Sequence, residues 1–276
     1  MEYKIVIDSA GDLRTLEDIP FASVPLKILA GEKEYVDDEA LDAVAMAEEL
    51  KHHKGKSGTA CPSVGEYLEA FGEAEQVFCV TIPSGLSGSC NAAKIAAETY
   101  REQHPERKVY VLDSLSAGPE MALLAQKLRA YILEGKLFEE IVERIEEYRQ
   151  KTHLIFSLES LTNLANNGRV NPAVAKIAGI LGIRMVGKAS DQGTLEILDK
   201  ARGEKRALAD IWKDMLSLGY NGGRVLIDHC NNLPAAQKLS QMIREKFAEA
   251  DVTIGKCGGL CTFYAELGGL MVGFEG

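Results

Sequence analysis

Residues Thr81 to Ser89, which read TIPSGLSGS, join a predicted strand to a predicted helix. The apolar run at 77–80 is typical of a buried strand, and residues 91–100 are typical of a helix. A loop of small and hydroxyl-bearing residues at such a junction gathers backbone N–H groups, hydroxyls and the positive end of a helix dipole at one point. The stretch is therefore a candidate site for a phosphate, sulfate or carboxylate, although similar loops also serve as plain strand-to-helix turns.

Predicted strands and helices alternate through the first half of the chain. This alternation is typical of an α/β fold with a mostly parallel sheet flanked by helices. Ligands in such sheets bind beyond the carboxyl ends of the strands. Polar residues follow three of these ends, at 8–9, 84–89 and 113–114, so we expect the three loops to converge on one edge. The predicted strands are 4–7, 23–30, 77–82 and 109–112, and the predicted helices are 12–19, 41–53, 63–71, 89–102 and 118–133.

The second half of the chain has a different pattern, which predicts a second α/β domain. We place the boundary near residue 150, giving domains at 1–150 and 151–276. Asn166 to Arg169 is a turn signal, and 191–193 predicts a hairpin between strands 184–188 and 194–198. The remaining predicted helices are 138–151, 172–181, 204–216 and 233–248, and the remaining strands are 153–157, 224–228, 252–254 and 270–274.

Charge and hydropathy exclude several classes of function. The chain has 276 residues, a net charge of −10 and no basic run, which disfavours nucleic acid and anionic membranes as partners. No signal peptide fits the N-terminus, and no apolar stretch approaches the roughly 20 residues that span a bilayer. We therefore expect a cytoplasmic protein whose six cysteines are reduced. Cys257 and Cys261 lack the second ligand pair of a zinc site, so no metal or cofactor is predicted.

Several motifs, in order from residue 4 to about 274, resemble those of the DegV family of lipid-binding proteins. Residues 84–89, SGLSGS, resemble the family's SGLSGT, and 59–68, TACPSVGEYL, resemble TSQPS-x-GEFL. The opening 5–9, IVIDS, resembles the first strand and the aspartate that follows it. Asp113-Ser114 resembles the DSKS element, and 167–170, NGRV, resembles GGRI. Ordered matches over nearly the whole chain are far more specific than any one motif.

The resemblance implies two α/β domains with a long-chain fatty acid bound between or beneath them. The residues that match the family's carboxylate ligands are Thr59 and Ser87, and the acyl chain is expected in an apolar tunnel. The head-group loops then belong to the first domain, and the second contributes to the acyl pocket. Further ligand-binding candidates are the other residues of the SGLSGS loop and the arginine of the NGRV turn, namely Ser84, Gly85, Gly88, Ser89 and Arg169.

The same resemblance implies a carrier that is not an enzyme, favours a monomer, and makes a separate fatty acid kinase a candidate partner. One departure from the family pattern affects the expected kinase partner more than the expected binding of lipid. The family usually has a histidine in a glycine-rich segment near the C-terminus, where this chain has FYAELGG at 263–269. Tyr264 or Glu266 is nearest, and we expect Glu266 to point away because its carboxylate would repel that of the ligand.

Two other functions remain open from the residues alone. One is a carrier of another amphiphile with an anionic head. The other is an enzyme that uses the Ser87 loop for acyl or phosphoryl transfer, although GLSG at 85–88 lacks the spacing of a G-x-S-x-G nucleophile elbow.

Overall fold

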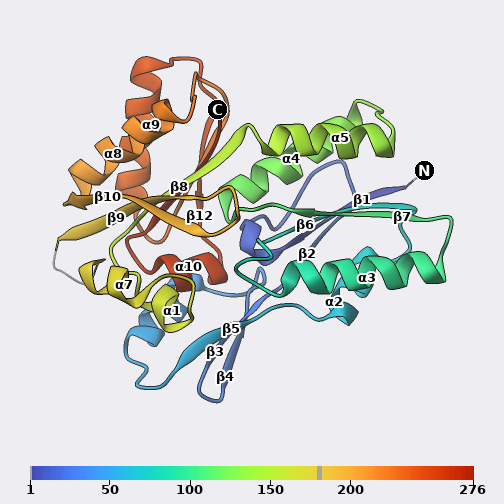
Figure 1. The fold of residues 1–276 in the computed structure, drawn as a ribbon, viewed down its shortest axis with the longest axis horizontal. Coiled ribbons are helices and arrows are strands. Elements are labelled where there is room, and N and C mark those ends of the chain that lie inside the picture. The colour runs from blue at the N-terminus through green and yellow to red at the C-terminus, as the bar shows by residue number, and fades with distance from the viewer. Residues whose placement is uncertain (1, 179–181) are drawn as a thin grey trace.

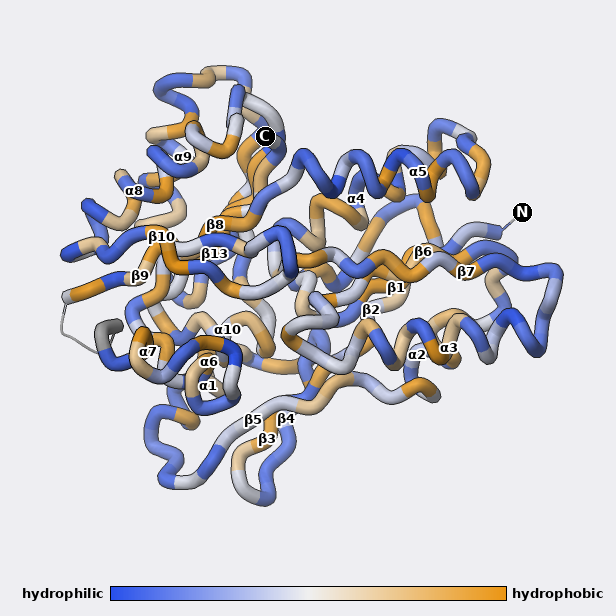
Figure 2. Tube along the Cα trace, in the orientation of Figure 1, coloured by the Kyte–Doolittle hydropathy of each residue, from blue (hydrophilic) through white to orange (hydrophobic). Residues whose placement is uncertain are grey.

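Helices cover three β-sheets in the part of the chain that the computed structural model describes, residues 2–178 and 182–276 (Figure 1). Figure 2 shows hydrophobic residues concentrated in the central strands, with hydrophilic residues on the outer helices. None of the described helices is long and apolar enough to cross a membrane.

The first sheet is fully parallel and has the strand order β2-β1-β6-β7. Its strands are β1 (Tyr3–Asp8), β2 (Phe21–Val24), β6 (Gln76–Thr81) and β7 (Lys108–Asp113). All six residues of β6 are buried, as expected for a central strand covered on both faces. One face packs against α2 (Val64–Phe71) and α3 (Ser89–Gln103), and the other against α4 (Pro119–Leu133) and α5 (Phe138–Arg149). This α/β layer confirms the predicted fold class.

The second sheet is mixed and has the order β10-β9-β8-β13-β11-β12. Only β11 and β12 pair in parallel among its described strands. The helices α8 (Glu204–Ser217) and α9 (Leu233–Lys246) cover one face and form a separate core with it. The strands are β8 (Thr152–Leu158), β9 (Ile183–Ala189), β10 (Leu195–Arg202), β11 (Val225–His229), β12 (Val252–Lys256) and β13 (Leu270–Glu275).

The third sheet is a small antiparallel one that the sequence did not reveal. It consists of β3 (Lys27–Ala30), β4 (Lys33–Val36) and β5 (Ser57–Ala60), in the order β4-β3-β5. The predicted strand 23–30 is wrong as one element, because it divides at Pro25 into β2 and β3, which belong to different sheets. The helix α1 (Ala43–Lys51) lies within the predicted helix 41–53.

The predicted helix at 12–19 is also wrong, because a short 3-10 helix (η1, Ser9–Gly11) is followed by irregular chain. Asp12 and Asp18 have positive φ angles of 53° and 64°, which no α-helix contains. The carboxylate of Asp12 accepts a hydrogen bond from the Gly258 amide at 2.9 Å, so a contact distant in sequence replaces the local helix.

Two short helices, α6 (Thr162–Asn166) and α10 (Gly259–Ala265), were also missed. The helix α7 runs from Pro172 to Ala178, and positions 179–181 of the predicted helix lie outside the described residues.

The three loops at the carboxyl edge of the parallel sheet converge, as predicted. The buried carboxylate of Asp8 accepts hydrogen bonds from the Ile82 amide at 2.9 Å and from the Ser89 hydroxyl at 2.7 Å. The carboxylate of Asp113 accepts one from the Ser84 amide at 3.3 Å. Burial raises the pKa of Asp8 to about 6, although these hydrogen bonds oppose the shift. Side chains at two strand ends thus fix the loop that connects β6 to α3.

A buried acid couples the stability of the protein to pH. Glu120 at the start of α4 accepts a hydrogen bond from the Thr152 hydroxyl of β8 at 2.8 Å, and burial raises the pKa of Glu120 to about 7. Because the fold favours the protonated acid, this contribution to stability is complete below the unfolded pKa and is lost as pH rises through about 7. The expected loss is about 3 kcal/mol.

Glu120→Gln keeps the acceptor for Thr152 and removes the titration. We predict that the loss of stability in urea unfolding between pH 4.5 and pH 8 is about 3 kcal/mol larger in wild type than in the variant, because other buried acids such as Asp8 titrate in both proteins. Equal changes with pH in the two proteins would contradict the assignment.

Candidate functional site

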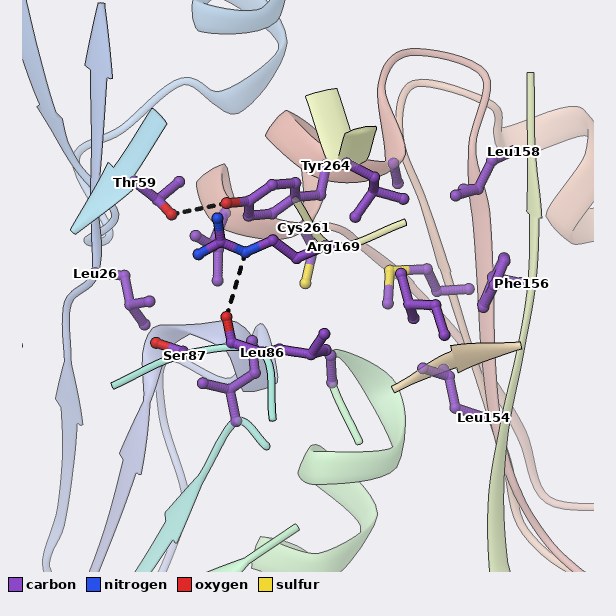
Figure 3. A pocket seen from close by; sticks show the side chains of 17 residues that line it. Leu26, Thr59, Leu86, Ser87, Leu154, Phe156, Leu158, Arg169, Cys261 and Tyr264 are labelled. Carbon is purple, nitrogen blue, oxygen red and sulfur yellow. Dashed lines mark hydrogen bonds between the residues drawn. The ribbon is translucent and has the colours of Figure 1, made fainter. Parts of the chain in front are cut away.

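An apolar cavity lies between the parallel sheet and the inner face of the second sheet (Figure 3). It leaves about 690 Å³ of space between its lining atoms, the open mouth included. Its apolar lining residues come from both halves of the chain: Leu26, Ile82, Leu86, Ala117, Leu154, Phe156, Leu158, Leu164, Leu195, Leu260, Cys261, Ala265 and Met271.

Four polar side chains gather at one end of this cavity, which we call the polar end: Thr59, Ser87, Arg169 and Tyr264 (Figure 3). The hydroxyls of Thr59 and Tyr264 are hydrogen-bonded at 2.8 Å. The Arg169 guanidinium carbon lies 5.7 Å from the centre of the Tyr264 ring, and Nε donates to the Leu86 carbonyl at 3.3 Å. Both halves of the chain therefore supply the polar end.

The charge of the polar end is positive. No Asp or Glu lines the cavity among the described residues, and within that part of the chain the Arg169 guanidinium bonds to backbone carbonyls rather than to a carboxylate. These carbonyls are those of Leu86 and Asn167. Burial raises the pKa of Tyr264, so its phenol keeps its proton at neutral pH. One guanidinium and three hydroxyls thus face the cavity, which favours an anion there.

The SGLSGS loop contributes a hydroxyl rather than a cradle of free amides. The amides of Leu86 and Ser87 donate to the Pro83 carbonyl at 3.0 and 3.1 Å. The Ser89 amide donates to the Ser87 hydroxyl at 3.2 Å. These three amides are already bonded within the loop, so the Ser87 side chain is the group from this loop that is best placed for an anion.

The structure does not bring the other predicted loop residues to the cavity. Ser84, Gly85 and Gly88 are exposed and do not line it. At Gly88 an added Cβ would lie 3.2 Å from the Cys61 sulfur, so the glycine allows the close approach of these two loops. Ser89 is fully buried and its hydroxyl bonds to Asp8 and, at 2.6 Å, to Tyr67. These contacts give Ser89 a structural role.

Tyr264 reaches the cavity because α10 is held at its N-terminus by a buried carboxylate. The amides of Gly259 and Leu260 donate to Asp37 at 2.7 and 3.0 Å. Asp37 also pairs with Arg14 at 2.5 Å, and its side chain is fully buried. A carboxylate is favourable at the positive end of a helix.

The four residues that α10 supplies to the cavity lie on one side of that helix: Leu260, Cys261, Tyr264 and Ala265. Their spacing is that of a single helical face. Sequence reasoning noted Tyr264 at the position of the family histidine but did not select it. The helical spacing of the residues at 260, 261, 264 and 265 is the sequence signal that could have identified Tyr264 as a site residue.

Glu266 lies away from the cavity, as predicted. Its carboxylate accepts hydrogen bonds from the Ser160 hydroxyl at 2.8 Å and from the Asn163 amide at 3.2 Å. It does not line the cavity.

The glycines at 258–259 account for the CGGLC sequence without a metal. An added Cβ would lie 2.7 Å from an Asp12 oxygen at Gly258 and 2.4 Å from a Leu41 carbon at Gly259, so both positions need the close approach that glycine allows. Cys257 and Cys261 are buried in an apolar core. The described residues contain no group of three or more metal-ligating side chains.

The geometry defines an α/β protein with an apolar cavity that ends in a small positive, hydroxyl-rich site. The chain belongs to the DegV family, because residues 2–275 match the family model described as "Uncharacterised protein, DegV family". A DegV domain-containing protein of Streptococcus pneumoniae is 46% identical over 279 residues, which cover 100% of this chain and 99% of that protein.

Two solved structures share this fold closely. One is the fatty acid kinase (Fak) B3 protein of Streptococcus pneumoniae loaded with linoleic acid, with a TM-score of 0.98, 46% identity and coverage of 100% and 99% of the two chains. The other is a DegV family protein of Eubacterium eligens loaded with heptadecanoic acid, with a TM-score of 0.97, 45% identity and coverage of 99% of each chain.

The two serines at the ends of the SGLSGS loop, Ser84 and Ser89, should behave differently on substitution. We predict that Ser89→Ala lowers the free energy of unfolding by about 1–3 kcal/mol, because it removes one buried hydrogen bond of Asp8 and one of Tyr67. The exposed Ser84→Ala is the matched control, with an expected change within about 0.5 kcal/mol. Chemical denaturation measures both. A Ser89→Ala protein as stable as wild type would remove the structural role of this hydroxyl.

Proposed function

We propose that this protein binds one long-chain fatty acid, with the carboxylate at the polar end and the acyl chain in the apolar cavity. The observation that carries the proposal is the distribution of polarity along the cavity. Thirteen of its seventeen lining residues are apolar, and the four polar ones lie together at one end. A molecule with one anionic end and a long apolar tail has the complementary pattern. The linoleic and heptadecanoic acids of the two similar structures support this choice.

We assign the carboxylate to the hydroxyls of Thr59 and Ser87, with Tyr264 and Arg169 next to them. Hydroxyl donors to a charged acceptor contribute roughly 1.5–3 kcal/mol each. The Thr59 and Tyr264 hydroxyls already bond to each other, so their geometry is set before the ligand arrives. The guanidinium of Arg169 supplies the opposite charge.

The acyl chain supplies most of the affinity in this proposal. Each buried methylene contributes about 0.8 kcal/mol, so a dozen or more exceed the contribution of the head-group contacts. The head group therefore sets the orientation of the ligand, and the tail sets how tightly it binds.

We further propose that the protein is a carrier rather than an enzyme, and that it acts as a cytoplasmic monomer. Two features support a carrier. Ser87 accepts a hydrogen bond from its own loop, and no His, Asp, Glu or Lys lines the described part of the cavity to act as its base. The similarity to a Fak B3 protein supports a fatty acid kinase as partner. In that role Tyr264 stands where the family usually has a histidine.

The head-group assignment predicts a loss of selectivity for acids. We expect the Thr59→Ala, Ser87→Ala double variant to bind palmitic acid at least about tenfold more weakly than wild type, because two charge-assisted hydrogen bonds are lost. Its affinity for palmitic acid methyl ester should change far less, since the ester carries no charge. Isothermal titration calorimetry measures both ligands. Ser84→Ala is the control, because this serine belongs to the same loop and does not line the cavity.

An unchanged affinity of the double variant for palmitic acid would overturn the head-group assignment. Tighter binding of dodecyl phosphate or another anionic amphiphile by wild type would favour the alternative carrier function. Hydrolysis of p-nitrophenyl palmitate that wild type catalyses and Ser87→Ala does not would favour the enzyme.

A further inference from the structure

A second cavity meets the apolar one at Leu154, and its lining is largely polar. We call it the polar compartment; its polar lining includes Ser114, Glu120, Arg149, Thr152, His153 and Asp191. It leaves about 950 Å³ of space between its lining atoms, the mouth included. The Nε atom of Arg149, one of the lining residues, is buried without a hydrogen-bond partner among the described residues. The compartment is therefore suited to water or polar groups and not to a hydrocarbon chain.

Leu154 is the one described residue that lines both cavities. Alternate residues of a strand face the same side, so Thr152, Leu154, Phe156 and Leu158 form one row on β8. Thr152 bonds to Glu120 in the polar compartment, whereas Phe156 and Leu158 line the apolar cavity. Polarity thus changes along this row at Leu154. Figure 3 places Leu154, Phe156 and Leu158 across the cavity from Thr59 and Ser87.

The start of α4 fixes the wall next to Leu154. Leu154 is paired with Gly273 of β13. An added Cβ at Gly273 would lie 2.5 Å from the Glu120 amide nitrogen, so α4 packs directly on this strand. Leu154 is itself only 2% exposed, so its side chain is closely packed where the two linings meet.

We propose that Leu154 is a partition that ends the acyl site and sets which chains fit. This inference rests on the proposed function. The partition selects fatty acids that end in an unsubstituted methyl group and are no longer than the distance to Leu154. A chain with a polar ω-end would bury that group against leucine without a partner, which is unfavourable. A longer chain would have to enter the polar compartment.

The test measures affinity against chain length for saturated fatty acids from myristic to behenic acid. For wild type we expect an increase of about fourfold per methylene, followed by a break where the chain meets Leu154. Leu154→Ala should move the break to longer chains, and Leu154→Phe should move it to shorter ones. Leu158→Ala is the matched control, because it lines only the apolar cavity and should weaken all chains without moving the break.

A second readout uses ω-hydroxypalmitic acid beside palmitic acid. Wild type should bind the hydroxy acid about tenfold or more weakly, and Leu154→Ala should reduce this difference to about threefold or less, because the hydroxyl reaches the polar compartment. If the alanine variant does not fold, the partition is still tested by the break point of the phenylalanine variant and by the affinities of wild type for palmitic and ω-hydroxypalmitic acid. A break at the same length in every folded variant would overturn the partition alone. Failure of wild type to bind any of the acids would overturn the proposed function and the partition together.

Discussion

The site depends on one buried carboxylate, that of Asp37. It accepts hydrogen bonds from the first amides of α10 and pairs with Arg14, and so ties a helix near the C-terminus to the first fifty residues. That attachment sets the depth at which α10 lies and places Tyr264 opposite Thr59, 205 residues away in sequence. Without it, the polar end would lose the hydroxyl pair that defines it, and the cavity would lose one of its walls.

The arrangement of polarity follows from how the two sheets meet. Helices cover both faces of the parallel sheet and one face of the second sheet, so the remaining apolar face needs another partner. Side chains of α6, α7 and α10 pack on this face and leave a cavity within that core. An acyl tail that displaces water from this hydrocarbon surface is bound favourably, because apolar area is removed from water. The few hydroxyls and one guanidinium at its end orient that tail without adding most of the affinity.

The sequence predicted the regular parts of this structure well. The runs at 77–80 and 109–112 and the polar residues after them predicted a parallel sheet and converging loops, because both signals are local. The prediction from sequence failed where contacts between distant residues determine the local structure. Asp12 bonds to Gly258, so no helix forms at 12–19. The strand β5 is short and polar, so only the family resemblance pointed to Thr59. Ser89 resembled Ser87 in sequence, and only burial against Asp8 separates their roles.

The most direct measurement of the central claim is a crystal structure of the protein bound to a fatty acid that carries bromine at its ω-carbon. Anomalous scattering locates the bromine independently of the rest of the ligand. The account predicts one bound molecule, with its carboxylate within hydrogen-bonding distance of Thr59 and Ser87 and the bromine beside the inner face of β8. Bromine at the polar end, or a ligand bound outside the cavity, would contradict it.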